Sequence, residues 1–343
     1  MMKSSNHIRR RSTIVGIIFA LASLSMTNCV KQEGGGVSGV GGTGASEGAG
    51  IRKEGKLVIG FAQMENNNPW RIAETNSFKE EAAKRGHEIV VSDAQGDAAR
   101  QVNNVEDLVT RRVDVIMLPP REFEGLSPAL KAAREAKIPV FLIDREAAGT
   151  PGQDYVAFIG SNFVQQGQRA GEWLIKQAGG KANIVELQGT SGASVTRDRK
   201  QGFADAISKS PGMKIIASQT ANFSRAEGQK VMETIIQARG REITAVYAHN
   251  DEMAIGAIQA LKAAGMKPGT DVLVVSVDGE KDALKAITAG EMNVTVESNP
   301  RLGPLAFDTL ERFRRGEKIE PRIIIQDRLF DSSNAAQFVD EAY

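Results

Sequence analysis

The sequence predicts an α/β protein with two doubly wound parallel sheets, and three observations support this fold class. The chain has 343 residues, which is more than one compact core usually serves and favours two domains of ordinary size. From Lys56 onward, short apolar runs rich in Val and Ile alternate with longer amphipathic stretches, the pattern of repeated strand–helix–strand units. These runs are also too many for one small sheet.

The first expected strand is Leu57–Phe61, and a helix with amphipathic spacing follows over residues 70–84, ended by Gly86. Two further helices are expected over residues 97–111 and 252–264. The other expected strands are Glu88–Val91, Val113–Leu118, Pro139–Ile143, Tyr155–Ile159, Ala182–Leu187, Lys214–Ala217, Ala245–Tyr247, Val272–Val277 and Val294–Val296. Strands this apolar need helices on both faces, and ligands of such sheets bind beyond the carboxyl ends of the strands.

The composition excludes several classes of protein. Hydrophobic residues make up 41% and charged residues 25% of the chain, which is ordinary for a globular protein and argues against disorder or many membrane spans. The 43 basic and 42 acidic residues leave a net charge of +1, so nothing attracts the chain to nucleic acid. The three histidines, His7, His87 and His249, are far apart, so no metal or cofactor is expected.

The first 29 residues are typical of an export signal. Basic residues precede the apolar run Ile14–Leu24, which is too short for a comfortable membrane span. Cys29 is the only cysteine, and Leu24–Cys29 resembles a bacterial lipoprotein processing site, although Asn28 departs from the small residue usual there. We therefore expect lipidation at Cys29 and a flexible tether over residues 30–55. The alternative is a signal peptide cut nearby with an incidental cysteine.

Several side chains at strand ends are suited to binding a polyol. Trp70 and Arg71 follow the polar loop after the first strand, and an indole can stack on the C–H face of a sugar ring. Asp144 and Asp278 each end an apolar strand, with Arg145 beside the first and Arg199 in a comparable loop. Carboxylates accept hydrogen bonds from hydroxyl groups, and guanidinium groups donate them. Each residue also has a plainer interpretation: Trp70 as a packing residue, and either Asp as a helix cap or Asx-turn.

The segment His249–Asp251 follows another expected strand and begins a helix. Asp251 is expected to be the N-cap of that helix. Asn250 can both donate to and accept from a pair of hydroxyl groups, so it is the better candidate for a ligand contact.

The residues from about Lys56 to Asp327 resemble the periplasmic sugar-binding proteins of ABC transporters, of the ribose-binding type and closest to galactofuranose binders. The stretches that carry the resemblance are Trp70–Thr75, Val185–Gly189, Gly192–Ser194, Asp198–Arg199 and Tyr247–Asp251. The resemblance implies a type I periplasmic binding protein fold, two lobes joined by a hinge. It implies pocket contacts at Trp70, Arg71, Asp144, Arg145, Arg199, Asn250 and Asp278, and further contacts at Asn68 and Phe223.

Two departures from the ribose binders argue against ribose as the ligand. Pro119 stands where those proteins have Asn, and Arg71 stands where they have a second aromatic residue. An Arg at that place follows the galactofuranose binders, whose ligand has an exocyclic diol. A hexose, with galactofuranose favoured, is therefore expected, and other hexoses stay open.

The resemblance also implies a domain division and partners. Residues 56–161 and 299–327 form one lobe, and residues 162–298 and 328–343 form the other. The partners are a monosaccharide and the membrane subunits of an ABC permease, and the protein is expected to be a monomer in the periplasm or cell envelope, anchored through Cys29.

Two rival functions fit the sequence less well, and a third remains an alternative. A glycosidase would use Asp144 and Asp278 as a carboxylate pair, but nearby arginines lower the pKa that a general acid needs to have raised. A sugar-responsive repressor needs a DNA-binding headpiece where this chain has its export signal and tether. A sensor for chemotaxis or signalling remains an alternative to transport.

Overall fold

The fold is that of a computed structural model, which describes residues 55–343. The expected signal segment, Cys29 and the expected tether up to residue 54 lie outside the described residues.

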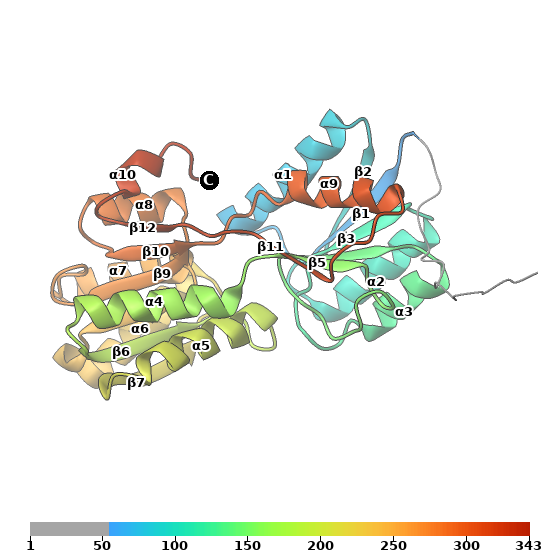
Figure 1. Cartoon of the computed structure of the whole chain (residues 1–343). Helices are drawn as coiled ribbons and strands as arrows, with labels where there is room; N and C mark the ends of the chain where they lie inside the picture. Colours follow the sequence, from blue (N-terminus) through green and yellow to red (C-terminus); the bar gives the residue numbers. More distant parts are fainter. Residues whose placement is uncertain (1–54) are drawn as a thin grey trace, which may run out of the picture. The chain divides into compact units, whose positions relative to one another are not determined.

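The first sheet has six parallel strands in the order β11-β5-β4-β3-β1-β2 (Figure 1). Its strands are β1 (Val58–Gln63), β2 (Glu88–Asp93), β3 (Val115–Leu118), β4 (Val140–Ile143), β5 (Ala157–Gly160) and β11 (Arg322–Ile324). Its helices are α1 (Pro69–Lys84), α2 (Ala98–Thr110), α3 (Ser127–Glu135) and α9 (Gly303–Arg314).

Both faces of this sheet are covered, as its apolar strands require. Val115 of β3 packs in the same core as Phe78 of α1 and Phe307 of α9. The next residue, Ile116, points the other way and packs with Leu108 of α2. This alternation follows from the two-residue period of a strand and explains why neither face of β3 is polar.

The second sheet has the order β12-β10-β9-β8-β6-β7, and only its edge strand β12 is antiparallel. Its strands are β6 (Lys181–Gln188), β7 (Gly212–Thr220), β8 (Ala245–Ala248), β9 (Leu273–Asp278), β10 (Val294–Glu297) and β12 (Leu329–Asp331). Its helices are α4 (Phe163–Gln177), α5 (Ser194–Ile207), α6 (Arg225–Arg239), α7 (Asp251–Ala263), α8 (Lys281–Thr288) and α10 (Ala335–Phe338), with a short 3-10 turn, η1 (Gly240–Glu242).

This sheet is also covered on both faces. Tyr247 of β8 stacks on Phe203 of α5 with 3.9 Å between ring centroids, while Val246 packs in the core that contains Met232 of α6. The prediction of two doubly wound sheets is therefore confirmed.

The chain passes between the two sheets three times, and these segments can be followed in Figure 1. It leaves the first sheet after β5, returns to it after β10, and leaves it again between β11 and β12. We call these segments the first, second and third crossings. A few crossing segments between two lobes make a hinge.

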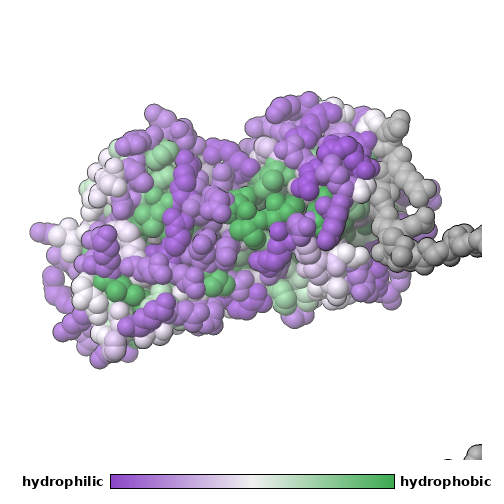
Figure 2. Space-filling model, viewed as in Figure 1, coloured by the Kyte–Doolittle hydropathy of each residue, from purple (hydrophilic) through white to green (hydrophobic). Residues whose placement is uncertain are grey.

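The surface seen in Figure 2 is mainly hydrophilic, with one larger hydrophobic area near the middle of the view and smaller ones elsewhere. Among residues 55–343, the large hydrophobic side chains exposed by more than a third are Ile72, Ile215 and Ile324. Isolated exposures of this kind are normal for a folded domain, so the apolar side chains lie mainly in the cores.

Candidate functional site

A pocket lies at the carboxyl ends of strands from both sheets. All nine residues predicted as ligand contacts line it: Asn68, Trp70, Arg71, Asp144, Arg145, Arg199, Phe223, Asn250 and Asp278. Three lining residues were not predicted: Glu65, Val195 and Ser298. The strand-end rule pointed to seven of these residues, and the family resemblance added Asn68 and Phe223; together they line one continuous site.

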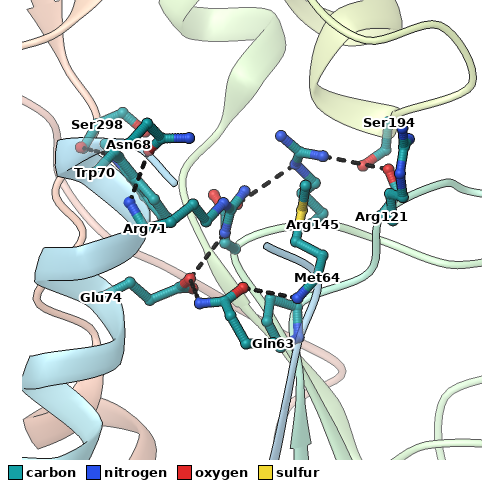
Figure 3. A network of polar contacts seen from close by, with 12 residues as sticks. Gln63, Met64, Asn68, Trp70, Arg71, Glu74, Arg121, Arg145, Ser194 and Ser298 are labelled. Carbon is teal, nitrogen blue, oxygen red and sulfur yellow. Dashed lines mark hydrogen bonds and ion pairs between the residues drawn. The ribbon is translucent and has the colours of Figure 1, made fainter. Parts of the chain in front are cut away.

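The start of α1 fixes the aromatic wall of the pocket. Asn68 caps this helix, and its side chain accepts a hydrogen bond of 2.9 Å from the backbone nitrogen of Arg71. Trp70 then lies in the first turn, where its indole nitrogen donates to the carbonyl oxygen of Ser298 at 2.7 Å (Figure 3). The Arg71 guanidinium lies 4.4 Å from the indole centroid. Trp70 is thus held both by packing and by a hydrogen bond to the second crossing.

Arg71 is held by two buried carboxylates. Its guanidinium donates to Glu74 at 2.8 Å and to Asp144 at 2.6 Å, and Figure 3 shows Arg71, Glu74 and Gln63 converging. Gln63 donates to the same Glu74 oxygen at 3.0 Å. Burial opposes the charged form of Arg71, but Asp144 and Glu74 outweigh it and raise the pKa of Arg71. Arg71 is therefore a fixed cation and donor.

Arg145 has an unused donor. Its side chain is buried and donates to the carbonyl oxygen of Arg121 at 3.2 Å, while its Nε has no hydrogen-bond partner among the described residues. Its guanidinium lies 5.2 Å from the centroid of the Phe223 ring. Burial and the neighbouring Arg71 lower the pKa of Arg145 to about 9. The nearest carboxylate oxygen, on Asp144, is 3.6 Å from Nε, which is too far for a hydrogen bond. A buried donor without a hydrogen bond is costly, so this group favours a ligand that brings an acceptor oxygen.

Arg199 of α5 and Asp278 at the end of β9 form the corresponding pair on the side of the second sheet, so Arg199 lies in a helix and not in the loop expected from the sequence. Arg199 donates to Asp278 at 3.2 Å, to Gln166 at 2.9 Å and to the carbonyl oxygen of His249. Burial raises the pKa of Asp278 well above its usual value, and Arg199 opposes this shift only in part. The expectation that nearby arginines lower the pKa of both pocket aspartates therefore fails for Asp278, because burial outweighs the attraction of Arg199.

The prediction that Asp251 caps α7 is wrong, because Asn250 is the N-cap. Asn250 has extended backbone and accepts from the Met253 nitrogen at 3.0 Å, as a cap requires. Its amide nitrogen donates to the Phe223 carbonyl oxygen at 3.3 Å. Asp251 lies inside the helix, where its carboxylate accepts from Thr295 and from the backbone nitrogens of Gly279 and Glu280 at 2.7–2.8 Å.

Three pocket residues have backbone conformations that favour glycine. The φ angles are 61° for Asp144, 59° for Phe223 and 138° for Asp278. Such conformations cost of order 1–3 kcal/mol each in residues with a side chain, and they cluster at functional sites. Gly189 completes this arrangement, since a Cβ there would lie only 1.9 Å from the Phe223 ring.

Residues 59–318 match the family described as periplasmic binding protein domain. The chain belongs to this family. The galactofuranose-binding protein of Escherichia coli K12 is 45% identical over 262 residues, covering 76% of this chain and 82% of that protein. The ribose import binding protein of the same organism is 36% identical over 275 residues, covering 80% and 90%. The arabinose-transporter binding protein of Shewanella sp. ANA-3, solved with α- and β-L-arabinofuranose, matches with a TM-score of 0.80 and 39% identity, covering 83% and 95%.

The predicted type I periplasmic binding protein fold is thus confirmed. No helix within residues 55–343 of this periplasmic binding protein is long and apolar enough to cross a bilayer. In the same range, no cluster of His, Cys, Asp and Glu side chains has the arrangement of a metal site.

Two of the three unpredicted lining residues follow the same strand-end rule. Glu65 lies in the loop after β1, and Ser298 directly follows β10. Both would have been found if every polar residue within the first few positions after each strand had been counted. Val195 lies in the first turn of α5, and no polar signal marks it.

Proposed function

We propose that this periplasmic binding protein is an extracytoplasmic sugar-binding protein of an ABC transporter, which binds a hexose in the pocket and delivers it to the permease. The observation that carries the proposal is the lining itself: three buried guanidinium groups, two buried aspartates and two aromatic rings facing one space. A charged ligand would need a clear excess of one sign, whereas a neutral polyol uses donors and acceptors together.

Individual groups suit a sugar. Arg145 Nε can donate to a sugar oxygen, because among residues 55–343 it makes no hydrogen bond and only an ion pair of 3.6 Å with Asp144. Asp278, with its raised pKa, can either accept from a hydroxyl group or donate to one. Phe223 and Trp70 offer apolar ring surface to the C–H groups.

A furanose ligand, with galactofuranose favoured, is the specific form of the proposal. A relative at 45% identity is named a galactofuranose-binding protein, and the arabinose-transporter binding protein at 39% identity was solved with arabinofuranose. In this chain Arg71 keeps a fixed cation in the pocket, whereas Pro119 is not part of the lining. A hexofuranose with an exocyclic diol gives such a donor additional acceptors, and a pentose gives fewer.

The domain division and the closure motion belong to the same proposal. Residues 56–161 with 299–327 form one lobe, residues 162–298 with 328–343 form the other, and the three crossings are the hinge. Because the ligand contacts residues of both lobes, it binds the closed form more tightly and shifts the population toward it. The permease then recognises the closed form.

The export features complete the proposal. The segment 1–29 directs export, cleavage before Cys29 leaves this residue as the acylated first residue of the mature protein, and residues 30–55 are the tether. The protein is then a lipid-anchored monomer in the periplasm or cell envelope. Two acyl signals suffice for stable anchoring, and one does not.

The test is calorimetric titration of the purified protein with hexoses and pentoses, including methyl furanosides that hold the five-membered ring. The tightest binding is expected for a galactofuranose form, with Asp144→Asn weakening it. Asp107→Asn is the matched control, because Asp107 is half-exposed and pairs with Arg111 on the surface of α2. Failure of every sugar to bind the wild type contradicts the proposal.

The rivals are separated by other readouts. Release of free sugar from galactofuranosides would identify a glycosidase, and we expect none. If uptake of the bound sugar survives deletion of the protein while the chemotactic or transcriptional response to it is lost, the sensor function replaces transport.

A further inference from the structure

The three crossings meet at the side chains of two residues, Gln166 and Asp327. Asp327 lies on the third crossing, and one of its carboxylate oxygens accepts from Ser161 on the first crossing at 3.0 Å. Its other oxygen accepts from the amide nitrogen of Gln166 at 2.8 Å. The same nitrogen donates to the carbonyl oxygen of Glu297, at the start of the second crossing, at 3.1 Å. The donor end of one amide therefore links two crossings directly and the remaining one through Asp327.

The other end of Gln166 faces the pocket. Its amide oxygen accepts from Arg199 Nε at 2.9 Å, and Arg199 in turn donates to Asp278. Gln166 is only 1% exposed, so no water competes for these bonds. The two polar atoms of this amide thus have different partners, because the oxygen contacts a pocket residue and the nitrogen contacts the hinge.

Close packing of α4 against α5 holds this arrangement. A Cβ at Gly167 would lie 2.2 Å from the Arg199 carbonyl oxygen, and one at Gly202 would lie 1.9 Å from that of Val164. The two helix backbones are therefore nearly in contact, which places Gln166 and Arg199 side by side. The Tyr247 hydroxyl group also donates to the Arg199 carbonyl oxygen at 3.3 Å. Because the Arg199 backbone is held in place, a movement of its side chain reaches its neighbours through the side-chain hydrogen bonds, of which one goes to Gln166.

We propose that Gln166 is a positioning residue that couples the Arg199 guanidinium in the pocket to the three crossings of the hinge. The inference rests on the proposed sugar-binding function and adds how an occupied pocket reaches the hinge. A ligand that draws Arg199 or Asp278 toward itself moves the acceptor end of Gln166, and the amide transfers the change to Asp327 and Glu297. Neither end can be exchanged for the other, because an amide donates only from nitrogen and accepts only at oxygen.

Gln166→Glu cuts this connection at one end only. A carboxylate still accepts from Arg199, but its second oxygen faces the Asp327 carboxylate and the Glu297 carbonyl, where a donor is needed. Adding Asp327→Asn restores a donor, because the new amide nitrogen can donate to the carboxylate introduced at position 166 while its oxygen accepts from Ser161. The Glu297 carbonyl still lacks its donor, so restoration is expected to be incomplete.

The experiment compares wild type, Gln166→Glu and the double variant Gln166→Glu/Asp327→Asn. The control is Asn293→Ala, which removes two side-chain hydrogen bonds of 2.7 and 2.9 Å in the same lobe, at the opposite end of the β10 strand. Hydrogen exchange of the crossings is measured without ligand and with saturating methyl β-D-galactofuranoside, and affinity is measured by calorimetry. Thermal unfolding of each variant gives its stability.

Without ligand, Gln166→Glu is expected to speed exchange at all three crossings relative to the control, and the double variant to reverse this. With ligand, affinity is expected to fall about 10-fold in Gln166→Glu and to recover to within about 3-fold in the double variant, the range of coupled pairs. A Gln166→Glu variant that matches Asn293→Ala, or a double variant no better than Gln166→Glu, overturns the inference. If no sugar binds the wild type, the proposed function fails, and the ligand-free comparison still decides the role of Gln166.

Discussion

Removing the Trp70 side chain separates its two roles in the pocket. The indole supplies apolar ring surface to the pocket, and its nitrogen donates at 2.7 Å to the Ser298 carbonyl on the second crossing. Trp70→Phe keeps a ring and removes the donor. Trp70→Ala removes both. The residue is only 7% exposed, so both changes affect a well-packed position.

The expected magnitudes follow from these contacts. In Trp70→Phe the Ser298 carbonyl loses its donor, which costs about 1–3 kcal/mol of stability. In Trp70→Ala the stacking surface is lost as well, which weakens sugar binding by ~1–3 kcal/mol, or about 5- to 150-fold in Kd. Calorimetry with the tightest-binding sugar measures the second quantity, and chemical unfolding measures the first. Wild-type affinity in Trp70→Ala would show that the indole is only a packing residue.

Three further changes test other parts of the account. Gly189→Ala places a Cβ where the Phe223 ring lies and is expected to weaken sugar binding about 10-fold, measured by the same titration. Burial raises the pKa of Asp327 to about 6 from 3.8, so its contribution to stability is full below about pH 4 and is lost as the pH rises through 6. The unfolding free energy of wild type minus that of Asp327→Asn should therefore fall by up to about 3 kcal/mol from pH 4 to pH 7, and a pH-independent difference contradicts this. Cys29→Ser should move the protein from the membrane to the soluble fraction, and unchanged membrane association would reject lipidation there.

The regular elements of the fold could be predicted because hydrophobic periodicity is a local signal. The expected strand Val272–Val277 became β9, and the expected helix over residues 70–84 became α1, each with shifts of one or two residues. The edge strands β11 and β12 have three residues each, too few to show a period. Their place is set by long-range pairing with β5 and β10.

Seven of the pocket residues could be predicted from local patterns, since parallel strands bring their carboxyl ends to one edge of a sheet, whereas Asn68 and Phe223 came from the family resemblance. The residues that hold these pocket side chains in place were not predictable. Glu74 contacts Arg71 across one helical turn, but nothing local distinguishes it from a surface glutamate. Gln166 contacts Asp327 across 161 residues, a separation that no sequence pattern covers. The N-cap of α7 was assigned one residue late, because both Asn250 and Asp251 are good caps and only the backbone decides between them.

A crystal structure grown with the tightest-binding sugar tests the central claim most directly. The account predicts one sugar in the pocket, with an oxygen within hydrogen-bond distance of Arg145 Nε, hydroxyl groups on Asp144 or Asp278, and a C–H face against Trp70 or Phe223. A sugar bound elsewhere while this pocket stays empty would contradict it.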